Sequence, residues 1–426
     1  MAVTQTIMSG DLSAVSLALL IGTILLLIIR SRRPRMFPPG PLCLPALGNT
    51  LTIMRKTLVY AFRDWRKDYG DIFSVAIGTK WVIVINGYEN LREAFVKRGD
   101  SFSERPDIFV VREITKRHGI IGNSGPIWKE QRTFTLGALR DFGFGKKSLE
   151  VRVKEEVEIP GDLLSAKRLK HNIEQIMEFV EDRIQEHRKT FDEDNLRDFI
   201  DAYINEMNKC KEGDTTSFTE FQFVSTIRDL FIAGTETTAT GIKWAILYML
   251  HNPGIQEKMH EEILQVVGLG RLPSIHDKTM MPYCEAVIYE TLRMGNIVPL
   301  SVPHGTNEDV MFKGFIIPKD AVVIANLDSV LTDEEIFPEP SRFNPERFLD
   351  KEGKLQGFEK VLAFSLGRRM CLGESLARME MFLFLTSMVQ RFKFLPPKGE
   401  PAPPIVRRLG ISFSPAPYPM RAIFRV

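Results

Sequence analysis

Phe364-Ser365-Leu366-Gly367-Arg368-Arg369-Met370-Cys371-Leu372-Gly373 is the stretch on which the interpretation of the whole chain depends. The segment Glu374–Val389 follows it and has the pattern of a helix, while Lys360–Ala363 before it is expected to be extended. Cys371 would therefore lie at a helix N-terminus, where backbone N–H groups and the helix dipole favour the thiolate.

Three further residues of this stretch suit a flat, acidic ligand. Gly367 and Gly373 lack a Cβ, so they let the backbone bend and approach such a ligand closely. Arg369 adds a fixed positive charge that suits a carboxylate. A thiolate beside a flat, acidic ligand is typical of haem ligated by cysteine. The alternative for an isolated cysteine is a buried thiol that caps a surface helix.

The pattern Phe-x-x-Gly-x-Arg-x-Cys-x-Gly, formed by Phe364, Gly367, Arg369, Cys371 and Gly373, resembles the haem-binding loop of the cytochrome P450 family. The chain looks most like the microsomal, family-2 type. The resemblance implies that haem b binds at these positions, with Cys371 as the ligand of the iron. Electron donation by the thiolate then favours O–O cleavage.

Composition and charge are those of an ordinary globular protein. The 426 residues are 44% hydrophobic and 26% charged, and the net charge of +2 gives no reason to expect a nucleic-acid partner. The four cysteines are far apart in sequence, which argues against a disulfide framework or a zinc ribbon. The chain has no Gly-x-Gly-x-x-Gly motif, so electrons for redox chemistry must come from outside it.

Residues 12–29 form an uncharged run of 18 residues, long enough to span a bilayer. A cleaved signal peptide would need a basic start, but the basic residues lie after the run, between residues 30 and 35. We therefore expect a membrane anchor (1–33), a proline-rich hinge (34–41) and a haem-thiolate catalytic domain (42–426). The positive-inside rule places the N-terminus in the lumen and the catalytic domain in the cytoplasm. The microsomal resemblance implies the endoplasmic reticulum membrane.

Trp128 and Arg132 lie one turn apart on a predicted helix. Alone, this pair is usually only a packed, snorkelling pair. The pair resembles the Trp-x-x-x-Arg helix of the family, whose side chains reach the haem propionates. By the same resemblance, the propionates are held by Arg105, Trp128, Arg132, His304 and Arg369.

The resemblance breaks after a predicted charged helix, 146–157, where Glu158–Asp162 leads directly into a predicted helix at Leu163–Thr190. Family members have several further helices here, so roughly 60 residues are expected to be missing near 157–160. In the family, part of that segment packs against the central helix and part covers the substrate pocket.

Asn195–Met207 is expected to form one helix, and Ser217 with Glu220 has the spacing of a capping box that opens a longer one ending at His251. The longer helix contains Ala233-Gly234-Thr235-Glu236-Thr237-Thr238. In isolation, these hydroxyls could simply produce a local kink. The hexapeptide resembles the oxygen-activation motif of the family, which implies that Glu236 and the catalytic Thr237 deliver protons to bound dioxygen.

Glu290 and Arg293 lie three residues apart in a predicted helix, Met281–Met294, that is too apolar to be exposed. A surface ion pair is the alternative. The resemblance adds Arg347 as the third member of a structural triad, and a buried set of this kind is costly to break.

Short strands are predicted at the following places: 71–77 and 81–85 (a hairpin), 297–304, 310–315, 322–325, 392–395 and 411–413. The expected fold is mainly α, a cytochrome P450-like helical array with small β sheets, preceded by an N-terminal transmembrane helix.

The resemblance implies a membrane-bound monooxygenase that inserts one oxygen atom of O2 into an apolar small molecule, either a fatty acid or a xenobiotic. The substrate pocket would be lined by Ala233, Val298, Leu300, Phe413 and parts of 108–121. Electrons would come from an NADPH-dependent flavoprotein reductase, with cytochrome b5 as a further partner. The reductase would dock near Lys129, Arg140 and Arg368.

One alternative is a truncated, splice-variant-like membrane protein that keeps the motifs but holds haem poorly. A haem-thiolate isomerase that needs no reductase is disfavoured, because the acid–threonine pair is intact.

Overall fold

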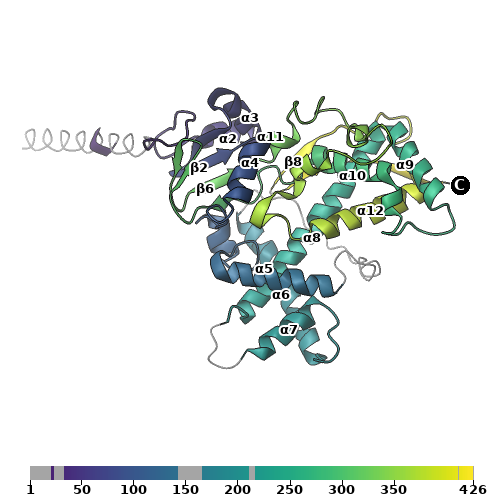
Figure 1. The fold of residues 1–426 in the computed structure, drawn as a ribbon, viewed down its shortest axis with the longest axis horizontal. Coiled ribbons are helices and arrows are strands. Elements are labelled where there is room, and N and C mark those ends of the chain that lie inside the picture. The colour runs from purple at the N-terminus through teal and green to yellow at the C-terminus, as the bar shows by residue number, and fades with distance from the viewer. Residues whose placement is uncertain (1–20, 24–32, 143–165, 211–215, 411, 426) are drawn as a thin grey trace, which may run out of the picture.

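The computed structural model describes residues 21–23, 33–142, 166–210, 216–410 and 412–425 (Figure 1). The expected membrane span lies outside these ranges except for residues 21–23. The predicted helix 146–157 and the expected gap near 157–160 lie wholly outside them. In the described ranges, no helix is both long enough and apolar enough to cross a membrane.

One end of the molecule is built around a four-stranded sheet of order β1-β2-β6-β3 (Figure 1). β1 (Ile72–Ile77) and β2 (Lys80–Ile85) form the predicted antiparallel hairpin, and β6 (Val322–Ala325) runs parallel to β2. The helix α3 (Leu58–Tyr69) packs its buried face, with Phe62 and Trp65, on this sheet.

The strand predicted at 297–304 is wrong, because only His304 and Gly305 pair, as β3. Pro299 and Pro303 have no N–H to donate to a ladder, so this stretch forms turns instead. Its side chains are nevertheless placed beside the sheet, where Leu300 packs on the same apolar cluster as α3.

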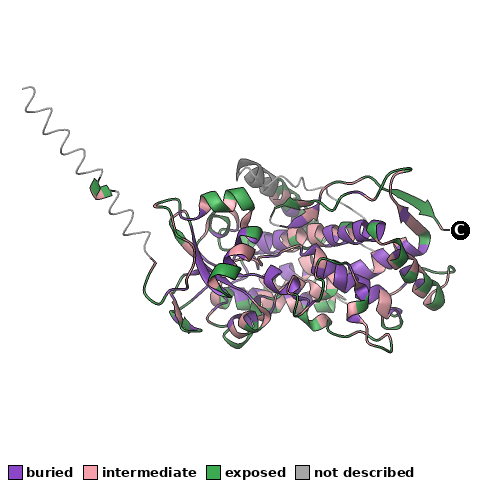
Figure 2. Cartoon of the chain, turned by 90° about the horizontal axis from the view of Figure 1, so that it is seen from above, coloured by how far each residue is buried: buried purple, intermediate pink, exposed green. Residues whose placement is uncertain are grey.

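The other end is helical and contains the main core. The long helix α8 (Glu220–His251) packs on α9 (Pro253–Val266), α10 (Pro282–Gly295) and α12 (Glu374–Arg391). Trp244 of α8 and Phe382 of α12 are completely buried. Figure 2 shows buried residues concentrated along the middle of the molecule, with exposed ones at its rim.

A third group of helices projects from this body at the bottom of Figure 1: α5 (Gly125–Asp141), α6 (Ala166–Lys189) and α7 (Phe199–Lys209). Tyr203 of α7 stacks on Phe223 of α8, with ring centroids 4.4 Å apart. The hydroxyl of Tyr203 donates to Gln131 Oε1 of α5 at 2.7 Å. These contacts attach α5 and α7 to α8.

The remaining described elements are short. They are α2 (Thr50–Lys56), α4 (Tyr88–Arg92) with a π-helical turn (Glu93–Lys97), a second π-helical turn (Val110–Ile114), β4 (Val310–Phe312), β5 (Phe315–Ile317), α11 (Asp328–Leu331), β7 (Phe392–Leu395), β8 (Arg407–Leu409), β9 (Phe413–Pro415), β10 (Arg421–Phe424), and 3₁₀ turns at Lys278–Met280, Pro345–Phe348, Phe358–Lys360, Leu362–Phe364 and Gly367–Arg369.

The proline-rich hinge packs against the domain. Ser74 of β1 donates its amide N–H to Pro39 O at 2.7 Å and its hydroxyl to Pro38 O at 2.6 Å. The Arg33 guanidinium bonds to the carbonyls of Gly40 and Pro41. A Cβ on Gly40 would lie 2.0 Å from Ser74 O, so glycine is required for this approach.

The capping box predicted at the start of α8 is wrong, because the N-cap lies two residues after Ser217. Thr219 is the N-cap, and its hydroxyl accepts a hydrogen bond from the Gln222 amide at 3.3 Å. The Ser217 hydroxyl instead accepts from Gln131 Nε2 at 2.9 Å, because this residue is buried against α5.

We predict that Thr219→Ala lowers the free energy of unfolding by about 1 kcal/mol, since it removes the side-chain acceptor at the start of α8. Thr219→Ser keeps the hydroxyl and should remain close to wild type. Urea unfolding followed by circular dichroism measures the difference. Equal losses in the two variants would contradict this cap.

Candidate active site

The cysteine loop is built from tight turns. The run 360–363, which we expected to be extended, belongs instead to the 3₁₀ turns Phe358–Lys360 and Leu362–Phe364. The Cys371 amide donates to Phe364 O at 2.9 Å, which closes the loop before α12 begins at Glu374.

The two glycines of this loop, Gly367 and Gly373, are explained by different structural features. Gly367 has φ +76°, and a Cβ there would lie 1.9 Å from Phe95 O. Glycine is thus required for packing on the π-helical turn Glu93–Lys97. The approach of Gly367 to a ligand stays a prediction. A Cβ on Gly373 would meet nothing within 4 Å, so space for a ligand is open there.

The thiol of Cys371 is exposed on one side and surrounded by protein on the others. Burial raises its pKa above the ordinary value, whereas a hydrogen bond with the Gly373 backbone acts in the opposite direction. The backbone N–H at the start of the helix thus favours the thiolate, as expected, but desolvation has the larger effect and leaves the pKa of Cys371 raised. A bound cation would reverse this balance.

Arg105, Arg132 and Arg369 converge near this loop, and among the residues that the structure describes their side chains donate hydrogen bonds only to backbone carbonyls. Arg105 donates to Ile121 O, Val302 O and Pro303 O at 2.7–3.1 Å. Arg369 donates to Ser103 O, Ile120 O and Asn123 O at 2.7–3.3 Å, and Arg132 to Met370 O at 2.7 Å.

His304 completes the cluster of basic residues. Its Nδ1 lies 2.8 Å from Phe102 O, which can only accept, so Nδ1 carries the proton and Nε2 stays free. Burial, with Arg105 nearby, lowers the pKa of His304 to about 3. Burial also lowers the pKa of Arg105 to about 10 and that of Arg369 to about 8, and other arginines of the cluster add to both shifts.

This cluster fits a ligand with carboxylates. None of its three arginines forms an ion pair with a carboxylate of the described residues. The Trp128 Nε1 atom is buried without a hydrogen-bond partner there, and the Arg369 guanidinium lies 3.6 Å from the centroid of the Trp128 ring. A buried donor needs an acceptor and a buried positive charge is stabilised by a negative one, so carboxylates would meet both needs. The structure therefore brings together Arg105, Trp128, Arg132, His304 and Arg369, the set expected from the sequence.

The acid–threonine segment lies in α8, where Ala233 and Gly234 are exposed. The Thr237 hydroxyl donates to Ala233 O at 2.6 Å, one turn back along the helix. The Glu236 carboxylate instead accepts from the Ser412 hydroxyl at 2.7 Å. The two side chains thus make separate hydrogen bonds, and their cooperation in proton delivery stays a prediction.

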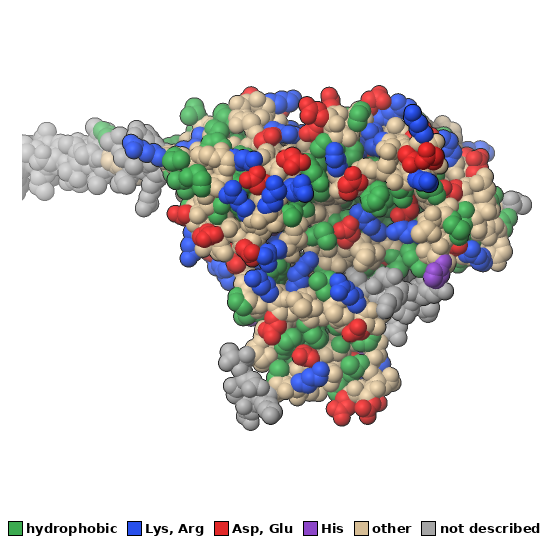
Figure 3. Space-filling view, in the orientation of Figure 1, with side chains coloured by type: hydrophobic (Ala, Val, Ile, Leu, Met, Phe, Trp, Pro, Cys, Tyr) green, Lys and Arg blue, Asp and Glu red, His purple; other side chains and the backbone are tan. Residues whose placement is uncertain are grey.

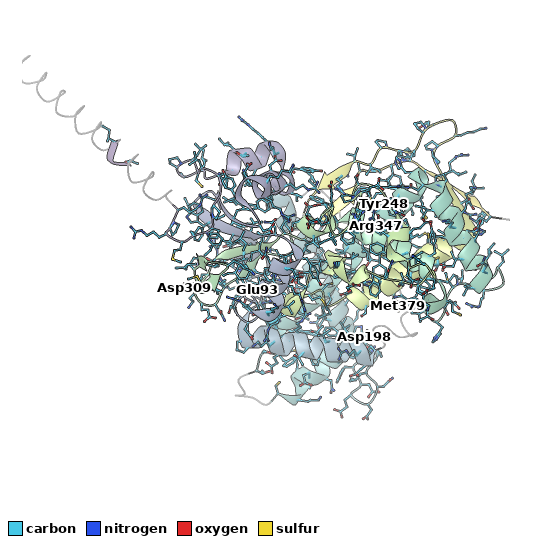
Figure 4. All side chains as sticks on the ribbon, turned by 45° about the horizontal axis from the view of Figure 1, so that its top comes forward. Glu93, Asp198, Tyr248, Asp309, Arg347 and Met379 are labelled. Carbon is cyan, nitrogen blue, oxygen red and sulfur yellow. The ribbon has the colours of Figure 1, made fainter. Side chains whose placement is uncertain are left out.

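Glu290, Arg293 and Arg347 meet as expected. Glu290 Oε2 accepts from Arg293 Nε at 2.7 Å, and Oε1 accepts from Arg347 Nε at 3.2 Å and from the Asn344 amide at 2.9 Å. Glu290 and Arg293 are at most 1% exposed. Arg347 lies in the helical part of the molecule with Tyr248 and Met379 (Figure 4). The triad fixes the 3₁₀ turn Pro345–Phe348 to α10.

The predicted substrate residues are only partly gathered. Val298 and Leu300 are half-buried and Phe413 is buried, and the Phe413 amide donates to Ile297 O at 2.7 Å. Ala233 lies on α8. A cavity of about 460 Å³ lies elsewhere, beside the cysteine loop, and is lined by residues that include Tyr88, Phe364 and Met370. None of the four predicted substrate residues lines it.

Lys129 and Arg368, two of the three residues expected at the reductase surface, both contact Asp100. Arg140 is exposed eleven residues after Lys129 on α5, which places it on the same helix face. Figure 3 shows basic and acidic side chains interspersed on the face that it presents.

Sequence reasoning missed Asp229, a buried acid on α8. It accepts the amides of Ile120 and Ile121 at 2.8 Å each and pairs with Arg228 at 2.7 Å. It therefore fixes the segment whose carbonyls hold Arg105 and Arg369. An acid within an apolar part of the long helix was the signal available in the sequence.

A family model described as "Cytochrome P450" matches residues 38–167 and 159–422. Cytochrome P450 2B4 of Oryctolagus cuniculus is 35% identical over 485 residues, covering 96% of this chain and 98% of that protein. Cytochrome P450 2J2 of Homo sapiens is 35% identical over 484 residues, covering 96% of each chain. Cytochrome P450 2D26 of Rattus norvegicus is 35% identical over 465 residues, covering 91% of this chain and 93% of that protein.

We predict that Glu290→Ala lowers the free energy of unfolding by about 3–5 kcal/mol, because two buried guanidinium groups lose their carboxylate. The matched control is Glu346→Ala, which removes an exposed partner of Lys258 in the same region and should cost at most about 1 kcal/mol. Denaturant unfolding of both variants checks the difference. Similar small effects would show that the triad is not a stabilising unit.

Proposed function

Because this chain belongs to the cytochrome P450 family, we propose that it is a membrane-bound monooxygenase that inserts one oxygen atom of O2 into an apolar small molecule with electrons from a reductase. It is a haem-thiolate enzyme of the oxidoreductase class, and its cofactor is haem b. When bound, the haem supplies the redox chemistry of oxygen activation.

The observation that carries the proposal is the basic cluster beside Cys371. The Cys371 thiol faces open space and would ligate the iron. Arg105, Arg132, Arg369, Trp128 Nε1 and His304 Nε2 would bind the two haem carboxylates. An anion there would satisfy the orphan Trp128 donor and raise the pKa of His304 towards its ordinary value.

On the helix α8, Thr237 and Glu236 are the groups that we assign to proton delivery. The Thr237 oxygen can accept a further hydrogen bond while its own proton is directed to Ala233 O. The neighbouring Ala233 and Gly234 have small or no side chains, which leaves room beside the helix for a ligand. Glu236 would act as the acid of the pair.

We place the substrate among Ala233, Val298, Leu300, Phe413 and parts of 108–121, whose apolar side chains suit a fatty acid or a xenobiotic. Electrons would arrive from an NADPH-dependent flavoprotein reductase at Lys129, Arg140 and Arg368, and cytochrome b5 is a further candidate donor. The microsomal type of the family supports the endoplasmic reticulum membrane, with the anchor (1–33) leaving the N-terminus in the lumen and the domain (42–426) in the cytoplasm.

The second candidate is a truncated, haem-poor protein. The alignment with cytochrome P450 2B4 extends over 485 residues, more than the 426 residues of this chain, so it includes gaps on the side of this chain. The two residue ranges matched by the family model overlap at residues 159–167. Both facts support a chain shortened near 157–160, where the missing helices are expected. The basic cluster beside Cys371 instead favours the working enzyme.

We predict that the reduced, CO-treated wild-type protein shows a red-shifted Soret band, because a thiolate ligates the iron. Cys371→Ala should abolish this band. Cys43→Ala, which removes a cysteine beside the hinge, should leave it unchanged. Absorption spectra of proteins expressed with ample haem precursor provide the measurement. A colourless wild type would favour the truncated alternative.

We predict that Thr237→Ala keeps the Soret band but lowers product formed per O2 consumed by about tenfold or more, since one member of the pair assigned to proton delivery is lost. Thr235→Ala is the matched control, because Thr235 makes the same backbone bond, to Phe231 O at 2.9 Å. Oxygen uptake and product yield are measured together. Unchanged coupling in Thr237→Ala would remove its assignment.

A further inference from the structure

Ser412 is a buried residue whose hydroxyl is aimed at the acid of α8. It is 8% exposed and donates to Glu236 Oε1 at 2.7 Å. The two residues are 176 positions apart in sequence, so the tertiary fold alone creates this contact. A serine donor is neutral, which means that it orients a carboxylate without neutralising its charge.

The backbone next to Ser412 is fixed on two sides. The Phe413 amide donates to Ile297 O at 2.7 Å, and Phe413 O accepts from Trp244 Nε1 of α8 at 2.8 Å. Trp244 is completely buried and lies two turns after Glu236 on α8. The Ser412 hydroxyl is therefore held at a defined position relative to α8.

The Thr237 hydroxyl, next to Glu236 in sequence, is not part of this contact. Its proton is directed to Ala233 O at 2.6 Å, along the helix. The Glu236 carboxylate is thus bound to the β8–β9 hairpin, and not to its neighbour on α8.

We propose that Ser412 is a positioning residue for Glu236, holding its carboxylate at the β8–β9 hairpin. This inference rests on the proposed function, in which Glu236 and Thr237 act as a pair. Ser412 also connects the acid to the strand that carries Phe413, a predicted wall of the substrate pocket. Movement of this strand would change the orientation of Glu236.

The contact is tested by infrared spectroscopy of the full-length protein labelled with ¹³C-glutamate. The carboxylate band of Glu236 is the one lost in Glu236→Gln. It should shift in Ser412→Ala. It should stay at its wild-type position in Ser412→Thr, which keeps the hydroxyl, and in Ser414→Ala, which changes a serine of the adjacent strand β9. An unshifted band in Ser412→Ala would overturn the proposal. This measurement needs no turnover, so it is decided even when the proposed function fails.

The role is tested by product formed per O2 consumed. Ser412→Ala should lower this ratio at least about threefold in the wild-type background. It should have no further effect in the Glu236→Gln background, and Ser412→Thr should keep the wild-type value. A change of equal size in both backgrounds would show that Ser412 acts on packing alone, and would overturn its positioning role.

Discussion

Positive charge collected in the interior is the constraint on which the active-site region depends. Arg105 and Arg369 are both less than 10% exposed and have only carbonyl oxygens as partners in the described protein. Besides burial, Arg132 opposes the protonation of Arg105, and Arg105 and Arg132 both oppose that of Arg369. Such an arrangement is unfavourable in isolation and becomes favourable when an anion joins it. The folded chain is therefore prepared for an acidic cofactor before the cofactor arrives.

Several distant segments cooperate to hold this cluster. Asp229 of α8 binds the amides of Ile120 and Ile121, and the carbonyls of the same two residues accept from Arg369 and Arg105. The helix thus fixes the loop, and the loop fixes the arginines. Gly367 lets the cysteine loop contact the π-helical turn at Phe95. Haem binding and overall stability are consequently linked through ordinary backbone contacts.

Patterns of residues predicted the long helix α8, the hairpin β1–β2 and the members of the basic cluster. The helix and the hairpin could be predicted because hydrophobic periodicity and turn residues reflect local geometry. The members of the basic cluster were implied by motifs that resemble those of the family. What failed depends on tertiary environment. Ser217 has the spacing of a cap, but it is buried against α5 and its hydroxyl accepts a hydrogen bond from Gln131. The Ser412–Glu236 contact joins residues without any sequence relation, so no local pattern could indicate it.

The proline hinge has a consequence for how the protein behaves at high concentration. β1 forms the outer edge of its sheet, and an open edge invites strands of other molecules to add to it. Here Pro39 O accepts the Ser74 amide, and the Asn49 side chain accepts the Ala76 amide. The hinge and the segment after it therefore cover this edge. They protect the protein against aggregation by intermolecular β-sheet growth without forming a further strand.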